Sequence, residues 1–509
     1  MKKQILVILS GFLLTGLVGF GQKITYSEPD RDDSRTLNFE VIGKVGGKVM
    51  IYKNYQSLHQ IVTLGSDMKQ VDKTKLDFIN VRLLNSEFIQ YSDFVYMFYQ
   101  YQKKSILYCM VAKLDASGKK IGEPIHLDST DNINYSANNK IYSILHSEDK
   151  QKILLFKVNT QNDKANLLST FLFDKDMVLQ KKSKISINMP QRNDFLSEFS
   201  LDNQGDLICI RVSGTSTNDN INKISLITKP ALSDNFSLTD LKLANIYLDD
   251  IRIKVDNFNK HYIITSFYSK LKRGNIEGLY YLLWDKQQNK ELLNATTPFT
   301  EEFREEARGE GNPKSAFNDC FLKNIILRKD GGFIVIAESA YTSSRGNTLN
   351  RWDYLYGSPY FSPTDYYSWN SPIGYYPWGQ SSMYNSNNNL TRYFADNVSL
   401  LSFGPDGKME WSNVIRKTQY DDNTDNYIGF GIFNTGEELH FIFNLQEKRS
   451  MILTNQNITR SGQINRNATL KNLDKGYDFM ARHAKQIGVR QAIVPCLYRG
   501  FTCFAKIEF

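Results

Sequence analysis

Short apolar runs alternate with polar turns along almost the whole chain. The clearest pair covers residues 325–337, where two apolar runs flank the turn Lys329-Asp330-Gly331-Gly332. Glycine reaches the positive φ that tight hairpin turns require, so two β-rich runs joined by Asp-Gly-Gly predict a β-hairpin. This hairpin is the clearest copy of a unit that recurs through the chain.

Eight copies of the hairpin can be recognised from their second apolar run. These runs lie at residues 49–52, 94–98, 153–156, 207–210, 262–264, 333–336, 439–443 and 492–494. A second pair of strands follows most copies, with turns such as Asp115-Ala116-Ser117-Gly118. The repeated unit therefore has four strands and a period of roughly 45 to 60 residues, which is typical of propeller blades.

Four-stranded units at this period predict an all-β fold, a β-propeller of eight blades. Seven blades is the alternative, because the first and last units are the least regular. The last unit ends one strand short at Phe509, and a short β-like segment at residues 23–27 precedes the first full unit. We expect this segment to supply the outer strand of the last blade, which would close the ring and cover an exposed strand edge.

The hydrophobic–turn–hydrophobic pairs and their Asp-x-x-Gly-Lys turns resemble the β-propeller repeats of exported bacterial proteins. The resemblance covers most of residues 39–509 and concerns architecture, since the WD and kelch signature dipeptides do not recur. Composition points the same way. Aromatic residues reach 13%, and tyrosine and phenylalanine suit the pleated, half-buried surface of a sheet.

Residues 1–21 have the features of a secretory signal peptide. Two lysines precede an apolar stretch at residues 5–20, and small residues at Gly19 and Gly21 predict cleavage after Gly21. A membrane anchor is disfavoured, because the stretch is short and interrupted by glycines. We therefore expect residues 22–509 to form a single propeller domain that is exported. Its expected location is periplasmic or outer-membrane-associated, with an extracellular location as the alternative.

Charge and motif content argue against nucleic-acid binding and against several enzyme classes. Lys and Arg are scattered rather than clustered, although the formal net charge is +8. The chain has no His-Glu-x-x-His pair, no Gly-x-Ser-x-Gly elbow and no Gly-x-x-x-x-Gly-Lys phosphate loop. The acidic run at residues 421–425 lacks the glycine and glutamate of a calcium loop and is interpreted as a solvated loop. We expect no catalytic residue, metal or cofactor, and a glycosidase assembled from carboxylates of distant blades stays open.

Two segments interrupt the repeat. Residues 300–308 predict a short acidic helix that begins after Thr300. Residues 345–393 form a long insertion in the sixth unit, in which tyrosine, tryptophan, proline, asparagine and serine dominate. Rigid aromatic rings separated by adaptable polar groups are typical of a recognition surface.

The expected partner-binding residues are aromatic side chains of this insertion: Trp352, Tyr354, Tyr356, Tyr360, Tyr366, Tyr367, Trp369, Tyr375, Tyr376 and Trp378. Two alternatives remain: a loop that only covers an edge of its own propeller, and a surface that stacks on a glycan. Outside the insertion, Cys496 and Cys503 fall on neighbouring predicted strands of one hairpin. A disulfide between them is one prediction, and small buried thiols are the alternative.

These features predict a non-enzymatic, periplasmic protein-interaction subunit that docks on an outer-membrane secretion or transport machine. The expected partner is a protein, either an outer-membrane barrel or its complex, and the chain is expected to have no membrane span of its own. An exported protein of this size and composition is similar to the accessory propellers and plug-like subunits of the type IX secretion translocon. The alternative is a secreted propeller that binds or cleaves glycans.

Overall fold

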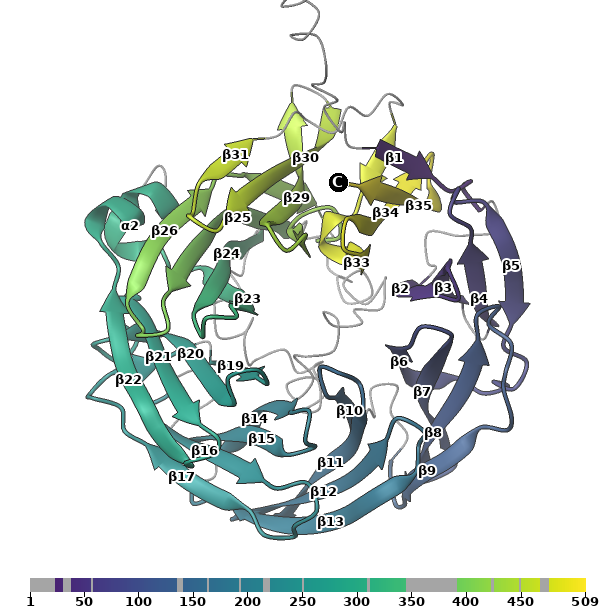
Figure 1. The fold of residues 1–509 in the computed structure, drawn as a ribbon, viewed down its shortest axis with the longest axis horizontal. Coiled ribbons are helices and arrows are strands. Elements are labelled where there is room, and N and C mark those ends of the chain that lie inside the picture. The colour runs from purple at the N-terminus through teal and green to yellow at the C-terminus, as the bar shows by residue number, and fades with distance from the viewer. Residues whose placement is uncertain are drawn as a thin grey trace, which may run out of the picture.

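Eight sheets, each built on four antiparallel strands, stand around a central axis in the computed structural model (Figure 1). The structure describes residues 23–30, 38–55, 58–134, 141–162, 164–191, 194–213, 220–249, 251–308, 312–344, 391–422, 425–447, 450–466 and 476–509. The first strand of each blade lies nearest the axis and the last lies at the rim. The prediction of an all-β propeller with eight blades is confirmed.

The first four blades follow one another in chain order, and each pairs its strands in sequence. Blade 1 comprises β2 (Asn38–Val45), β3 (Lys48–Tyr55), β4 (Leu58–Leu64) and β5 (Gln70–Lys75). Blade 2 comprises β6 (Leu83–Gln90), β7 (Phe94–Lys103), β8 (Ile106–Asp115) and β9 (Ile125–Thr130). Blade 3 comprises β10 (Tyr142–His146), β11 (Lys152–Asn162), β12 (Ala165–Asp174) and β13 (Leu179–Asn188). Blade 4 comprises β14 (Phe195–Leu201), β15 (Leu207–Ser213), β16 (Lys223–Lys229) and β17 (Ser237–Leu241).

Blades 5, 6 and 8 vary the pattern at their inner strand or by adding a strand, whereas blade 7 pairs its four strands in sequence like the first four. Blade 5 comprises β18 (Tyr247–Leu248), β19 (Arg252–Asp256), β20 (His261–Ser269), β21 (Gly278–Asp285) and β22 (Lys290–Pro298). Blade 6 comprises β23 (Cys320–Leu327), β24 (Phe333–Ser344), β25 (Thr391–Phe403), β26 (Met409–Ile415) and the added β27 (Gln419–Asp422). Blade 7 comprises β28 (Phe430–Asn434), β29 (Glu438–Glu447), β30 (Ser450–Thr459) and β31 (Ile464–Arg466). Blade 8 comprises β32 (Tyr477–Phe479), β33 (Lys485–Gly488), β34 (Gln491–Tyr498), β35 (Phe501–Glu508) and β1 (Lys23–Tyr26).

The position of a strand within its blade determines its sequence pattern. The middle strand β15 is buried along its whole length, because neighbouring blades cover both of its faces. The rim strand β13 instead alternates buried Ser183, Ile185 and Ile187 with exposed polar side chains, because one of its faces meets solvent. Continuous apolar runs therefore mark the middle of each blade, and these are the runs that the sequence shows most clearly.

The N-terminal segment closes the ring, as the sequence predicted. Strand β1 is the outermost strand of blade 8 and pairs with β35 along its whole length. The Ser27 N–H donates to the Phe504 carbonyl (2.8 Å), and the Ser27 Oγ accepts from the Phe504 N–H (3.0 Å). Asp30 Oδ2 then lies 3.2 Å from Nζ of both Lys53 and Lys73 in blade 1. The segment thus joins the last blade to the first.

The connection from blade 5 to blade 6 contains helix α2 (Glu301–Arg308) and the 3₁₀ turn η1 (Pro313–Ser315), and a second 3₁₀ turn, η3 (Ala481–His483), lies in blade 8. Thr300 Oγ1 accepts from the Phe303 N–H (3.2 Å), which is the usual N-cap contact. Phe303 is buried against Phe299 and Phe317, so α2 packs into the core between these blades. In the described part of the chain, no helix combines the length and the apolar character that crossing a membrane requires.

Candidate functional site

The predicted partner-binding residues, from Trp352 to Trp378, lie outside the residues that the structure describes. Both ends of their insertion are described, because β24 leads into it and β25 leads out of it. The candidate site is therefore defined by the strands that carry the insertion.

These strands extend blade 6 into a three-stranded ribbon. Strands β24 and β25 pair from Phe333↔Phe403 outward, shift register after Glu338, and continue to pair over residues 340–344 and 391–395. Strand β27 joins the other edge of β25 over residues 392–395. We call residues 340–344, 391–396 and 419–422 the blade 6 ribbon.

Aromatic stacking and a half-buried carboxyl group stabilise one side of the ribbon. The rings of Tyr341 and Phe394 stack with their centroids 4.6 Å apart. The Tyr341 hydroxyl donates to Asp396 Oδ2 at 3.1 Å. Burial raises the pKa of Tyr341 to about 12 and also raises the pKa of Asp396. Tyr341 therefore stays a neutral hydrogen-bond donor, and the two strands are tied together close to the insertion.

The same side of the ribbon also presents a charged and aromatic group to solvent, because Arg392 and Phe394 are two residues apart on β25 and Phe394 pairs with Tyr420. Arg392 Nε lies 2.7 Å from Asp422 Oδ1, and its Nη2 lies 3.1 Å from Asp422 Oδ2. The guanidinium carbon lies 4.5 Å from the centre of the Tyr420 ring, which is 42% exposed. A bidentate pair stacked on a ring holds all three side chains in one arrangement. The hydrogen bond from Arg392 lowers the pKa of Asp422, so this arrangement is charged at neutral pH.

A buried ion pair forms the root of the ribbon. Lys417 Nζ is fully buried and lies 2.7 Å from Glu338 Oε1 of β24. It also donates to the Ala395 carbonyl (2.9 Å) and to Gln419 Oε1 (2.8 Å). Burial lowers the pKa of Lys417 against the attraction of Glu338. Burial also opposes ionisation of Glu338, but Lys417 and Lys323 outweigh it, and the pKa of Glu338 is lowered. The lowered pKa keeps Glu338 ionised at neutral pH, and its carboxylate opposes the loss of the charge of Lys417.

Side-chain amides carry this network from blade 6 into the next two blades. Gln419 Oε1 accepts from the Gly429 N–H (2.9 Å), and its Nε2 donates to the Asn444 carbonyl (2.8 Å). Asn444 Nδ2 donates to the Phe479 carbonyl in blade 8 (2.7 Å). The ribbon is thus anchored to three blades rather than to one.

The acidic run at residues 421–425 does not gather its carboxylates into a metal site. Asp422 pairs with Arg392, while Asp425 pairs with Arg482 of blade 8. Among the residues that the structure describes, no group of three or more His, Cys, Asp or Glu side chains could hold a metal ion.

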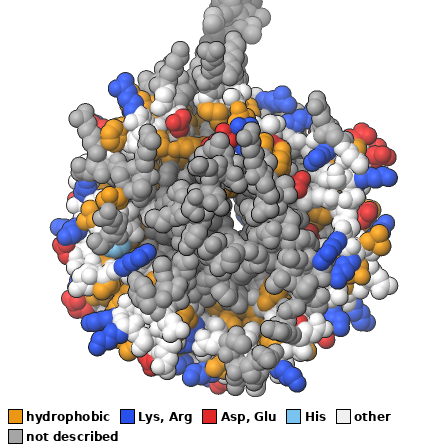
Figure 2. Space-filling model, turned by 180° about the vertical axis from the view of Figure 1, so that it is seen from behind, with side chains coloured by type: hydrophobic (Ala, Val, Ile, Leu, Met, Phe, Trp, Pro, Cys, Tyr) orange, Lys and Arg blue, Asp and Glu red, His pale blue; other side chains and the backbone are white. Residues whose placement is uncertain are grey.

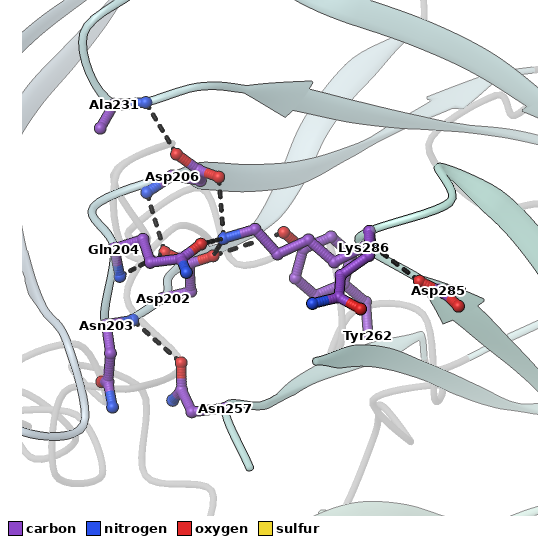
Figure 3. Close-up of polar contacts among 10 residues, drawn as sticks. Asp202, Asn203, Gln204, Asp206, Ala231, Asn257, Tyr262, Asp285 and Lys286 are labelled. Atoms are coloured by element: carbon purple, nitrogen blue, oxygen red, sulfur yellow. Dashed lines mark hydrogen bonds and ion pairs between the residues drawn. The ribbon is translucent and has the colours of Figure 1, made fainter. Parts of the chain in front are cut away.

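A second charged cluster lies at the seam of blades 4 and 5 (Figure 3). Lys286 contacts Asp202 and lies 2.8 Å from Asp206 Oδ2. Asp202 Oδ1 accepts from the backbone N–H groups of Gln204 and Asp206, at 2.9 Å each. The adjoining cavity, next to Tyr262, has a volume of only about 10 Å³, which is room for about one water molecule. This cluster fastens two blades together and is too tightly filled to be a ligand site.

A third charged group belongs to the innermost strands of blades 1, 2 and 8. Burial raises the pKa of Glu40 on β2 to about 7, Lys485 on β33 opposes that rise, and Glu87 on β6 adds to it. A carboxyl group that titrates near neutrality can donate or accept a proton during a reaction. Sequence patterns do not reveal this group, because its members lie far apart along the chain.

Sequence reasoning also missed the ribbon residues Arg392, Tyr420 and Asp422, and the ion pair at its root. One signal was present, since β-favouring residues flank the insertion on both sides and could have predicted longer strands there. The buried pair gives no such signal, because Glu338 and Lys417 are far apart in the sequence.

The two cysteines for which a disulfide was one prediction, Cys496 and Cys503, lie opposite each other on β34 and β35.

The face opposite to that in Figure 1 shows how the charges of the described residues are distributed (Figure 2). Lys and Arg side chains are spread around the rim and mixed with Asp and Glu, and the described side chains form no basic stripe on this face.

Comparison with known proteins adds only general likenesses. No family model matches the chain, and no curated protein matches it. Among solved structures, an ulvan lyase of the polysaccharide lyases has a TM-score of 0.38 and 10% identity, covering 83% of this chain and 92% of its own. A prolyl endopeptidase has a TM-score of 0.35 and 9% identity over 84% of this chain and 55% of its own. A Synechocystis apocarotenoid oxygenase has a TM-score of 0.33 and 8% identity over 73% and 72%. Scores this low carry no argument about activity.

Proposed function

We propose that this protein is a non-catalytic scaffold that binds a protein partner through the ribbon and insertion of blade 6. The blade 6 ribbon is the observation that supports the proposal. It holds both ends of an aromatic insertion on paired strands that are rooted in three blades. A segment held at both ends on a rigid support loses less conformational freedom when it binds than a free loop does.

The exposed side chains of the ribbon have the chemistry of a protein interface. Tyrosine and arginine are enriched among the residues that contribute most to binding. Tyr420 and Arg392 are already ordered by their contact with each other and with Asp422. A partner would therefore meet an aromatic and charged surface that needs little rearrangement.

The proposal also covers the cellular location of the protein and the identity of its partner. The leader predicted for residues 1–21 supports export, and the proposed partner is then an outer-membrane barrel or its complex. An accessory subunit of a type IX translocon is the more specific version, and it is supported by resemblance alone.

The test replaces residues 346–389 with a short Gly-Ser linker, which leaves the blade 6 ribbon intact. The tagged wild-type protein is cross-linked in envelope extract, its partner is identified by mass spectrometry, and the affinity is then measured with purified components. We expect the replacement to weaken binding at least ~30-fold, since a single hot-spot residue contributes ~2 kcal/mol or more. Circular dichroism should be unchanged.

A matched pair of point variants separates the ribbon from the rest of blade 6. The double substitution Arg392→Ala and Tyr420→Ala should weaken partner binding. Lys408→Ala, at the exposed turn that follows β25, should not. If the linker variant binds the same purified partner with wild-type affinity, the proposal is wrong.

The structure gives one specific observation in favour of a glycan-cleaving propeller. Glu40 and Glu87 lie on neighbouring inner strands, and burial raises the pKa of Glu40 to about 7. Glycosidases use two carboxyl groups, one of which acts as an acid near neutral pH. Release of reducing ends from a polysaccharide panel, abolished by Glu40→Gln but not by the linker variant, would favour this alternative.

A further inference from the structure

Two buried cysteines face each other in the blade that closes the ring. Cys496 on β34 lies directly opposite Cys503 on β35, and neither side chain is exposed (0% each). Their sulfur atoms are 2.9 Å apart. The other cysteines, Cys109, Cys209 and Cys320, belong to blades 2, 4 and 6, so none of them competes for this pairing.

The backbone already has the geometry that a disulfide requires. Opposite residues of antiparallel strands have Cα atoms about 4.5–5.5 Å apart, which lies within the range found for disulfides. The turn between the strands is Arg499-Gly500, with φ of 52° and 86°. Positive φ at both turn residues is the signature of a two-residue hairpin that fixes the register of its strands. Both cysteines are free thiols in the structure, and their sulfurs have to approach by only about 0.9 Å to bond.

We propose that Cys496 and Cys503 form a disulfide as the chain folds in an oxidising compartment, and that this bond fixes the hairpin on which the N-terminal strand docks. The location supports this role. Cys503 precedes Phe504, whose backbone exchanges two hydrogen bonds with Ser27. The whole of β1 pairs with the remainder of β35, so a hairpin held in register presents a complete edge to the incoming segment.

The chemistry is a thiol–disulfide exchange with a small disulfide such as oxidised glutathione. The Cys496 thiolate attacks one glutathione sulfur, the glutathione S–S bond breaks, and one glutathione thiolate leaves. The Cys503 thiolate then attacks the Cys496 sulfur of this mixed disulfide and displaces the second glutathione. Two electrons pass from the cysteines to glutathione, and the two thiol protons end on the two glutathione molecules released.

The folded structure indicates when this exchange takes place. Burial raises the pKa of Cys496 well above its usual range, so the reactive thiolate is scarce once blade 8 has formed. A bulky glutathione also cannot reach two side chains with no exposed surface. Oxidation therefore precedes the packing of blade 8 and the docking of β1.

The test counts thiols in residues 22–509, the chain without its predicted leader. The protein is reduced in guanidinium, refolded in a glutathione redox buffer, quenched in acid, unfolded again and alkylated. We expect three of the five cysteines to be alkylated, and a peptide that links Cys496 to Cys503. Five alkylated cysteines, or a link that involves any other cysteine, would overturn the proposal. Protein that is first refolded with its thiols reduced should oxidise at least ~10-fold more slowly in the same buffer, and equal rates would overturn the proposed order of events.

A stability comparison tests the role of the bond. Chain-entropy arguments for such a short loop predict that the oxidised protein has an unfolding equilibrium constant on the order of 50-fold smaller than the reduced protein. The double substitution Cys496→Ala and Cys503→Ala should abolish this dependence on reductant, whereas Cys209→Ala should leave it intact. A wild-type protein with the same stability in oxidised and reduced form would refute the stabilising role.

Discussion

Replacing Lys417 with methionine is the sharpest test of how the ribbon is supported. The substitution keeps most of the side-chain volume and removes a positive charge that contacts Glu338, the Ala395 carbonyl and Gln419. Glu338 is only 2% exposed, and Lys323, at 3.5 Å, is then the cation that remains in its ion-pair network. Loss of one partner of a buried ion pair costs about 3–5 kcal/mol. We expect the lower end of this range, because Lys323 stays.

Amide hydrogen exchange measures this loss where it occurs. A cost of about 3 kcal/mol in the local opening free energy corresponds to roughly 100-fold faster exchange. We expect that acceleration for the amides of β25 and β27 in the ribbon. The strands of blade 3, on the far side of the ring, should exchange at the wild-type rate and provide the internal control.

The pH dependence of this loss of local stability in Lys417→Met provides a second test. In the wild-type protein the pKa of Glu338 is lowered, so its contribution to stability is present above its ordinary value of 4.5 and disappears as the pH falls through the folded value. Without Lys417, burial would raise this pKa, and protonation of Glu338 would relieve the defect. The difference in amide exchange rate between Lys417→Met and the wild-type protein should therefore shrink as the pH approaches 4.5.

A double variant decides whether the charge itself is responsible. Glu338→Gln combined with Lys417→Met leaves no uncompensated carboxylate and should recover at least half of the lost protection. Unchanged exchange in Lys417→Met, or a double variant as unprotected as the sum of the two single variants, would show that the ribbon does not depend on the pair.

Three further predictions concern the ring. Deleting residues 22–28 exposes the edge of β35, so we expect a lower melting temperature and aggregation in light scattering; a deletion variant as stable and soluble as wild type would rule out closure by this segment. Lys286→Met leaves two acidic side chains at the seam of blades 4 and 5 without their cation and should cost about 2–4 kcal/mol in chemical unfolding, whereas the exposed control Lys290→Met should not. Burial lowers the pKa of His59 to about 4, so the unfolded chain binds the extra proton between pH 6.5 and 4. Stability should then fall by up to about 1.4 kcal/mol per pH unit on acidification, and His59→Gln should reduce that slope.

The parts of the fold that could be predicted from the sequence are those where the hydrophobic pattern of a single strand is enough to identify it. Middle strands such as β15 are buried on both faces, and so they form unbroken apolar runs between glycine-containing turns. Repetition of these runs gave the number of blades. The missing last strand, together with the β-like segment at residues 23–27, gave the closure.

The side-chain clusters could not be predicted, because their members meet only after blades have twisted and packed. Lys286 and Asp202 are separated by 84 positions in the chain, and both read simply as turn residues of different hairpins. Glu338 and Lys417 are far apart in the sequence, because the insertion lies between them. The pairing of β24 with β25 brings their strands together, whatever the length of the insertion. The split inner strands of blades 5 and 8 also depart from the repeat, since an inner strand is short and gives a weak local signal.

The contact between Ser27 and Phe504 joins residues that are 477 positions apart in the chain. Seven blades are complete as soon as their own consecutive strands have been synthesised, whereas blade 8 needs the two extremities of the chain at once. Contacts between such distant positions form slowly, because a very long loop must close before any pairing energy is gained. A nascent chain is therefore an open arc, with β1 unpaired at one end and one edge of β35 unpaired at the other, until closure of the ring completes its folding.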